Sequence, residues 1–132
     1  NCSIGPYARL REGSYIDDSA KIGNFVETKK TKVGKKSKAN HFADHGDAYI
    51  GKDSNIGAGT ITGNYDGKDK HQTKIGDNSF VGTNSSLVAP VTIGSNAYVA
   101  AGSVIKKELP HNALGLGRAK KNNKQNWSKK KG

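Results

Sequence analysis

The residues whose types and spacing could do chemistry lie close together, between His41 and His45. The imidazole of histidine titrates near neutral pH, so a neutral histidine beside a carboxylate can act as a general base. His41, Asp44 and His45 could instead bind zinc, since two imidazoles and a carboxylate are suitable ligands. Alternate residues of a strand point to opposite faces, however, and this favours the general base over the metal site. We expect no bound metal.

The other two histidines, His71 and His111, are expected to be solvated. His71 belongs to an insertion, residues 63–73, that is rich in turn-forming residues such as Asn64 and Gly67. One interpretation of this insertion is a plain excursion from a corner of the fold. An excursion of this length on a regular repeat is more often the wall of a binding site.

Positive charge indicates an anionic partner. The 132 residues include 22 Lys and Arg against 11 Asp and Glu, a formal net charge of +11. Nucleic acid is the first candidate. Only 7% of the residues are aromatic, and they are not interleaved with the basic ones, so stacking surfaces for bases are lacking. We therefore expect no nucleic-acid partner.

The elements that position the histidines and Asp44 follow a repeat of six residues. Aliphatic residues recur at every sixth position in one clean run: Ile75, Val81, Leu87, Ile93, Val99 and Ile105. An earlier run begins at Ile4 and slips by one residue at Val33 and again at Ile50. A period of six fits neither an α-helix nor a two-faced strand. It predicts an all-β fold, a parallel β-helix in which three hexads close one coil and about five to six coils stack. The glycine after many of these aliphatic residues is expected to ease the turn.

The slips set which side chains stack on one another. Equivalent positions lie 17 residues apart in this part of the repeat, so His41 is expected over Asn24 and Glu27 beside Asp44. His45 falls at an inward position, where a satisfied interior or rim histidine is the ordinary interpretation. The low apolar content, 33%, is also explained, because a narrow prism buries only about one aliphatic residue in six.

Two parts of the chain are expected, a β-helix over residues 1–106 and a basic tail over residues 107–132. The tail contains Trp127 and is expected to pack on a neighbouring subunit or to be disordered. No run of about 18 apolar residues and no signal-peptide core is present. The single Cys2 excludes an internal disulfide. These features predict a cytoplasmic protein with no membrane partner.

Several motifs together resemble one family. They are Ile4-Gly-Pro-Tyr-Ala-Arg-Leu-Arg11, Gly23-Asn-Phe-Val-Glu27-x-Lys-Lys30, Gly46-Asp-Ala, Asn55-Ile-Gly-Ala-Gly-Thr-Ile-Thr62, Asn64-Tyr-Asp-Gly67 and Leu87-Val-Ala-Pro-Val-Thr-Ile-Gly94. The family is the C-terminal acetyltransferase domain of bacterial bifunctional N-acetylglucosamine-1-phosphate uridyltransferase / glucosamine-1-phosphate N-acetyltransferases. The resemblance implies a left-handed parallel β-helix and a homotrimer with active sites between subunits. It also implies that the family's N-terminal uridyltransferase domain is absent from this chain.

The resemblance further implies a reaction, transfer of acetyl from acetyl-CoA to the amine of glucosamine-1-phosphate, which supplies UDP-N-acetylglucosamine synthesis. Acetyl-CoA is then a co-substrate, and no tightly bound cofactor is implied. His41 matches the family's general base. The positions that match sugar-phosphate contacts are Arg11, Lys29, Asp44, Asn55 and Lys70. The positions that match acetyl-CoA contacts are Asn64, Tyr65, Thr83, Ala101 and Arg118.

One departure from the family concerns the sugar half of the site. Asp44 stands where the family has a tyrosine that contacts the sugar phosphate. At an effective dielectric of about 20, two like charges ~4 Å apart repel by about 4 kcal/mol. We therefore expect Asp44 to weaken phosphate binding unless Lys29 or Arg11 neutralises it or it points away.

Smaller departures leave the acetyl-CoA half intact. Thr83 replaces a serine and keeps the hydroxyl, while His45 and His71 replace apolar residues. Glu27 is a candidate to orient His41. Two alternatives to the transferase stay open, a catalytically impaired binding module and a zinc-dependent β-helix hydratase.

Overall fold

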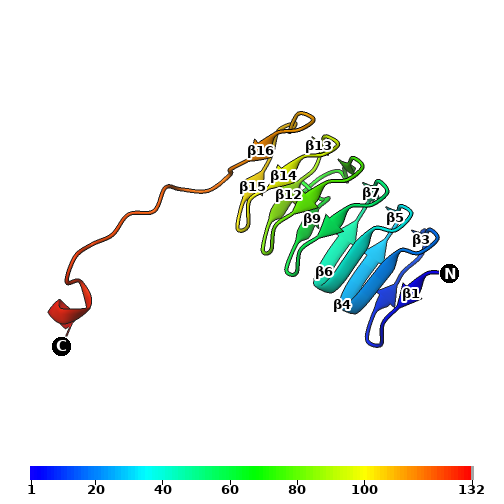
Figure 1. Cartoon of the computed structure of the whole chain (residues 1–132), viewed down its shortest axis with the longest axis horizontal. Coiled ribbons are helices and arrows are strands. Elements are labelled where there is room, and N and C mark those ends of the chain that lie inside the picture. The colour runs from blue at the N-terminus through cyan, green and yellow to red at the C-terminus, as the bar shows by residue number, and fades with distance from the viewer. Residues whose placement is uncertain (132) are drawn as a thin grey trace.

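The computed structural model describes residues 1–131, which wind into a stack of coils built from short parallel strands (Figure 1). The strands are β1 (Ser3–Ile4), β2 (Arg9–Leu10), β3 (Tyr15–Ile16), β4 (Lys21–Lys29), β5 (Lys32–Val33), β6 (Lys38–Gly46), β7 (Ala48–Ile50), β8 (Asn55–Ile56), β9 (Ile61–Gly63), β10 (Thr73–Ile75), β11 (Phe80–Val81), β12 (Ser86–Val88), β13 (Val91–Ile93), β14 (Tyr98–Val99), β15 (Val104–Ile105) and β16 (Leu114–Gly115). A 3₁₀ helix, η1 (Ser128–Lys131), follows them. The predicted all-β parallel β-helix is confirmed.

The strands form two sheets that wrap around the prism. One sheet has the order β13-β10-β7-β5-β3. The larger has the order β15-β12-β9-β6-β8-β11-β14-β16, with β4 beside β6 and both β1 and β2 beside β4. The long strands β4 and β6 run around a corner, since β6 pairs with β8 at one end and with β9 at the other. Two faces of the prism are thereby joined into one sheet.

The interior follows the period of six. The inward isoleucine, leucine and valine residues that are at most 2% exposed are Ile22, Val26, Val33, Ile50, Ile56, Ile75, Val81, Leu87, Ile93 and Val99. Ile4 and Leu10, in the first coil, are 46% and 38% exposed. One stretch of the interior is polar, because Thr28, His45 and Thr62 are inward neighbours on successive coils. Burial of apolar area therefore stabilises most, but not all, of the prism.

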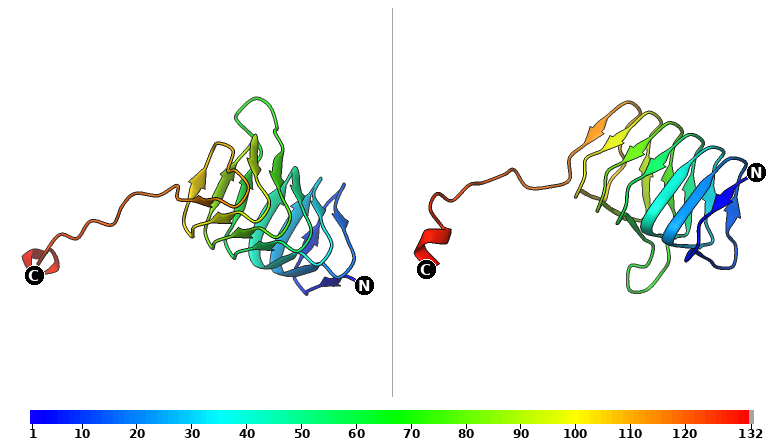
Figure 2. Two further views of the ribbon diagram at one scale, coloured as in Figure 1. Left: turned by 45° about the horizontal axis from the view of Figure 1, so that its top comes forward. Right: turned by 60° about the horizontal axis from the view of Figure 1, so that its bottom comes forward.

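The length of a coil changes along the chain. Paired residues lie 18 apart where β10 meets β13 (Ile75 with Ile93) and 17 apart where β4 meets β6 (Ile22 with Ala39). They lie 25 apart where β7 meets β10 (Ile50 with Ile75), because the insertion lies between these strands. Figure 2 shows this loop projecting from the prism. The predicted slips and insertion are confirmed.

Glycine has a different role from the one expected. The glycine after an inward aliphatic residue does not hold a left-handed backbone. It lies against the backbone of the next coil instead, since a Cβ on Gly82 would stand 2.5 Å from the amide nitrogen of Ala101. The left-handed corners are held mainly by other residues, such as Asn78 and Asn96, at φ 53° and 55°. Close approach of coils, not turn freedom, requires these glycines.

The coils continue beyond residue 106, where the sequence placed the end of the β-helix. Leu109 is buried, and β16 pairs with β14, so Leu114 and Gly115 still belong to the stack. The segment after Arg118 leaves the prism and extends away from it (Figure 1). Within the described residues, no helix has the length and apolar character needed to cross a membrane.

Candidate functional site

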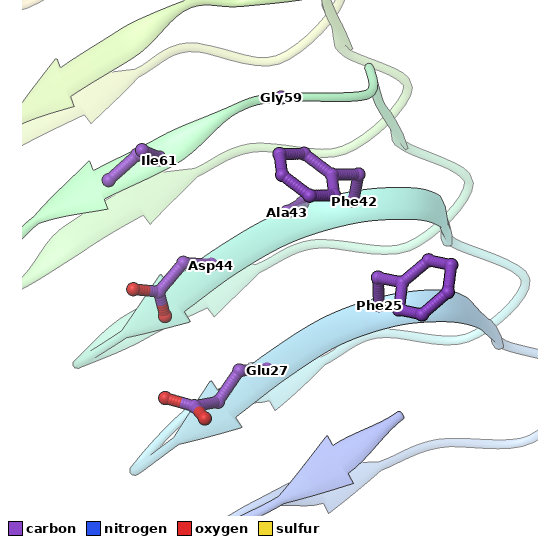
Figure 3. A pocket seen from close by; sticks show the side chains of 7 residues that line it. All are labelled: Phe25, Glu27, Phe42, Ala43, Asp44, Gly59 and Ile61. Carbon is purple, nitrogen blue, oxygen red and sulfur yellow. The ribbon is translucent and has the colours of Figure 1, made fainter. Parts of the chain in front are cut away.

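The candidate site lies on β4 and β6, around the corner that these two strands share. The predicted stacking is confirmed, because His41 pairs with Asn24 and Asp44 pairs with Glu27 in parallel register. Figure 3 shows the carboxylates of Glu27 and Asp44 projecting to the same side of neighbouring strands. The aromatic side chains of Phe25 and Phe42 lie at the other end of the same pocket.

A polar pocket of about 200 Å³ collects the charged residues. Its lining residues are Arg11, Glu27, Lys29, Asp44, Gly46, Thr62, Asn64 and Lys70. Four of the five predicted sugar-phosphate residues therefore come together, and Asn64 joins them from the acetyl-CoA set. Lys70 arrives from the insertion, which forms one wall of the pocket.

Carboxylates partly neutralise the cations of this pocket. Arg11 and Arg9 lie 3.7 Å and 3.6 Å from the carboxylate of Glu27, and Lys29 lies 3.4 Å from Glu12. These pairs are partly exposed, so each is worth little in stability. The guanidinium of Arg11 thus lies beside Glu27 on the pocket wall, and the side chain of Lys29 is 22% exposed.

Asp44 has a different environment from Glu27. Burial against its coil raises the pKa of Asp44, the nearby charge of Glu27 raises this pKa further, and Arg11 lowers it. Among residues 1–129, whose side chains the structure describes, no cationic nitrogen lies within 4 Å of the Asp44 carboxylate. Neither Lys29 nor Arg11 therefore pairs with it directly.

An apolar pocket of about 340 Å³ adjoins the polar one and shares Glu27 and Asp44 with it. Its other lining residues are Phe25, Phe42, Ala43, Gly59 and Ile61. Phe25 and Phe42 hold positive φ values of 58° and 44°, which cost L-residues about 1 kcal/mol each. The next coil has Gly59 at this corner, whose amide donates to the carbonyl of Phe42.

His41 is exposed beside this apolar pocket. Its ring centroid lies 6.0 Å from that of Phe25 in an edge-on arrangement and 6.5 Å from that of Phe42. The sequence analysis did not assign Phe25 or Phe42 to the site. Their separation of 17 residues, the local length of a coil, could have predicted that they lie on neighbouring coils beside His41.

His45 departs from the expected satisfied histidine. Its side chain is fully buried inside the prism, and neither ring nitrogen has a hydrogen-bond partner among the described residues. Burial lowers its pKa to about 4, so the ring is neutral near pH 7. Since His45 points inward while His41 lies on the outer surface, the two imidazoles do not share a zinc ion. Nowhere in residues 1–131 do three potential metal-ligating side chains gather.

The insertion is an ordered loop. Asp66 accepts hydrogen bonds from the amides of Lys68 and Asp69, and its other carboxylate oxygen lies 2.7 Å from Nε2 of His71. These contacts lower the pKa of Asp66 to about 2, the Asp69 amide having the largest effect. The hydroxyl of Tyr65 donates to the carbonyl of Gly67 at 2.8 Å. His71 is therefore paired and only partly exposed, contrary to the solvated side chain expected.

The remaining predicted residues lie outside the polar pocket. Arg118 donates to the carbonyl of Ala101 at 2.7 Å, and the amide of Gly102 donates to the carbonyl of Thr83 at 2.8 Å. Thr83, Ala101 and Arg118 thus form a second cluster on the later coils. Asn55 lies on β8, paired with Lys38 and Phe80, and does not line the polar pocket.

Known sequences match this chain along its whole length. The bifunctional protein GlmU of Thermosipho melanesiensis is 60% identical over 132 residues, all of this chain and 29% of the relative. The bifunctional protein GlmU of Rhizobium rhizogenes is 61% identical over 89% of this chain and 26% of the relative. The chain therefore spans less than a third of the length of these relatives. The resemblance identified from the motifs is confirmed.

A family model and solved structures agree with the fold. The model for bacterial transferase hexapeptide (six repeats) matches residues 72–107. A mutant of perosamine N-acetyltransferase from Caulobacter crescentus, in complex with CoA and GDP-perosamine, has a TM-score of 0.76 at 20% identity, covering 87% of this chain and 54% of that one. A mutant of AntD, an N-acyltransferase from Bacillus cereus in complex with dTDP and coenzyme A, has a TM-score of 0.73 at 18% identity, covering 98% and 88%. At these identities the two structures support the fold alone.

Proposed function

We propose that this chain transfers an acetyl group from acetyl-CoA to the amine of glucosamine-1-phosphate, on the premise that its whole length is similar to part of bifunctional GlmU proteins. The observation that carries the proposal is the polar pocket, where Arg11, Lys29 and Lys70 converge beside the strand that holds His41. Three cations suit a phosphate monoester, which carries nearly two negative charges and accepts charge-assisted hydrogen bonds.

His41 is the proposed general base. Its imidazole takes a proton from the substrate nitrogen as that nitrogen attacks the thioester carbonyl of acetyl-CoA. The new bond is the amide C–N bond, and the bond that breaks is the thioester C–S bond. The coenzyme A thiolate leaves and receives a proton, so the imidazole returns to its neutral form.

The second cluster is the proposed site for coenzyme A. The guanidinium of Arg118 uses one N–H on the carbonyl of Ala101 and retains further donors for the phosphates of coenzyme A. Thr83 and Ala101 supply an exposed surface beside it. Asn64 and Tyr65, on the insertion, are the proposed contacts for the acetyl and pantetheine end, and Asn64 also lines the polar pocket. Asn55 is retained as a proposed sugar contact, although it lies outside the polar pocket.

A homotrimer is part of the proposal. His41, Phe25, Phe42 and Ile61 are exposed on one chain, whereas acetyl transfer is favoured in a site that excludes water. A second copy would cover this surface. Sedimentation of the purified chain measures the assembly, and a monomer at micromolar concentration would contradict this part. The left-handed winding stays a prediction of the resemblance, and the cytoplasmic location stays a prediction of the sequence composition.

The direct test is an assay of thiol release from acetyl-CoA by the purified chain. Thiol is expected to appear only when glucosamine-1-phosphate is added, and N-acetylglucosamine-1-phosphate should form in equal amount. Glucose-1-phosphate, which has a hydroxyl in place of the amine, is the control acceptor and should give no release. Absence of acceptor-dependent release from the assembled protein would remove the transferase proposal.

A further inference from the structure

Asp44 stands at the boundary between two pockets of different character. Together with Glu27 it lines both the polar pocket and the apolar pocket. On one side lie the cations Arg11, Lys29 and Lys70. On the other side β6 continues back from Ala43 to Phe42 and His41. A ligand that reaches from the cations toward His41 must therefore pass Asp44.

The two carboxylates at this boundary are not equivalent. Glu27 lies within 4 Å of two guanidinium groups, those of Arg9 and Arg11. Asp44 has no such partner among the described side chains, residues 1–129, and the charge of Glu27 on the neighbouring strand adds repulsion. Asp44 is thus the carboxylate of this pocket that is free to pair with a cationic group of a ligand.

The charges of the pocket as a whole fit a zwitterion. Arg11, Lys29 and Lys70 are suited to an anionic group, and Asp44, which lines the same pocket, is suited to a cationic one. A ligand with only a phosphate would satisfy the cations and would leave Asp44 unmatched close to a second negative charge. A ligand with a phosphate at one end and an ammonium group at the other satisfies both.

Resting on the proposed function, we propose that Asp44 receives the ammonium group of the amino-sugar phosphate and so determines the preference for an amine over a hydroxyl at that position. The bound ammonium then lies on the His41 side of the boundary. It loses one proton to solvent, which leaves the neutral amine. The His41 imidazole takes the second proton as this amine attacks the thioester, and the leaving coenzyme A thiolate receives that proton. Asp44, which the sequence analysis expects to weaken phosphate binding, is in this proposal the residue that recognises the amine.

The test is calorimetric binding of glucosamine-1-phosphate and glucose-1-phosphate to the full chain, with no acetyl-CoA present. The two ligands share the phosphate and differ in the ammonium group. The wild-type protein is expected to prefer the amino sugar by about tenfold, the usual gain for a hydrogen bond to a charged group. Asp44→Asn should lose most of that preference through weaker binding of glucosamine-1-phosphate, with binding of glucose-1-phosphate unchanged or tighter.

Asp53→Asn is the matched control. Asp53 is an exposed carboxylate outside both pockets, and asparagine tolerates its φ of 55°. This variant should keep the wild-type preference, and circular dichroism should show both variants folded. Tighter binding of glucosamine-1-phosphate by Asp44→Asn would mean that repulsion of the phosphate dominates, and the inference would be wrong. Equal binding of both ligands by the wild-type protein also overturns it but leaves the proposed function standing, whereas no binding of either ligand overturns both.

Discussion

The coils that carry the candidate site and the coils that follow the insertion are built differently. Around β4 and β6 the coils are 17 residues long, and the interior holds Thr28, His45 and Thr62. From β10 to β15 the coils are 18 residues long, and all six inward repeat positions are aliphatic, as at Ile75 and Ile93. The second region gains more from apolar burial. We call the 18-residue coils from β10 to β15 the regular coils and the 17-residue coils around β4 and β6 the slipped coils. The comparison indicates that the regular coils provide stability and that the slipped coils accommodate the site.

The slipped coils hold unfavourable features that serve the pocket. Phe25 and Phe42 keep left-handed backbones at the corner, and His45 is buried without hydrogen bonds inside the described structure. Such features persist where the surrounding fold fixes them, and they cluster at functional sites. Only the adjacent coils can stabilise these features, because each coil of a solenoid contacts only the coils before and after it.

The largest expected effect is on activity, in the slipped coils. His41→Ala should lower kcat by roughly 10²–10⁴-fold, because it removes the proposed general base while leaving the pocket cations in place. Steady-state thiol release measures this. His111→Ala, at an exposed histidine on the later coils, is the control and should retain activity. A loss below tenfold for His41→Ala would place the base elsewhere.

The next effect is on stability, in the regular coils. Ile93→Ala should lower the free energy of unfolding by about 3 kcal/mol, because Ile93 is fully buried and the prism cannot collapse around the cavity. Urea unfolding measures the change. Thr92→Ala, at the exposed neighbour on β13, should change the unfolding free energy by less than about 0.5 kcal/mol. Similar losses for both variants would contradict the assigned inward face.

A change of similar size in the free energy of unfolding should appear when the pH is lowered, because His45 is buried in the slipped coils. His45 has a pKa of about 4 in the fold against an ordinary value of 6.5, so the unfolded chain binds the proton first as pH falls. Stability is therefore unaffected by this group above pH 6.5 and declines between pH 6.5 and about 4, by about 3 kcal/mol in total. Urea unfolding at several pH values measures the decline.

A variant without the titrating ring separates His45 from other groups. His45→Leu should remove most of this decline and should also stabilise the protein at pH 7, since two unpartnered polar atoms leave the interior. His71→Leu is the comparison, because His71 is paired with Asp66 outside the prism. If His45→Leu keeps the full decline, the acid sensitivity belongs to carboxylates instead.

The smallest effect concerns the outer surface of the slipped coils. The ammonium of Lys32 lies 5.4 Å from the ring centroid of Tyr15 and 5.6 Å from that of Tyr49, between rings on the coils before and after its own. Lys32→Gln should lower the unfolding free energy by about 0.5–1 kcal/mol, the usual worth of an exposed cation–π contact. Lys74→Gln, on the same face of β10, should have no measurable effect.

Several features could be predicted from the sequence because they depend on spacing alone. The period of six identifies the inward residues, and the slips at Val33 and Ile50 place His41 beside Asn24 and Asp44 beside Glu27. Arg11, Lys29 and Lys70 were assigned to one ligand by resemblance, and they do line one pocket. Their convergence was not calculable from spacing, since Lys70 lies on an insertion whose path a periodic pattern does not describe.

Other features depended on packing. The sequence alone determined a parallel stack of coils, because one aliphatic residue in every six leaves no other regular way to bury them. It did not determine that Gly82 is required by the close approach of the next coil's backbone. Nor did it determine that the ring nitrogens of the buried His45 have no hydrogen-bond partner among the described residues. Only the tertiary structure decided that Glu27 pairs with two arginines while Asp44 has no cationic partner among the side chains of residues 1–129. The reason is physical: the charge state and partners of a side chain depend on distances between coils, whereas the repeat records only positions along the chain.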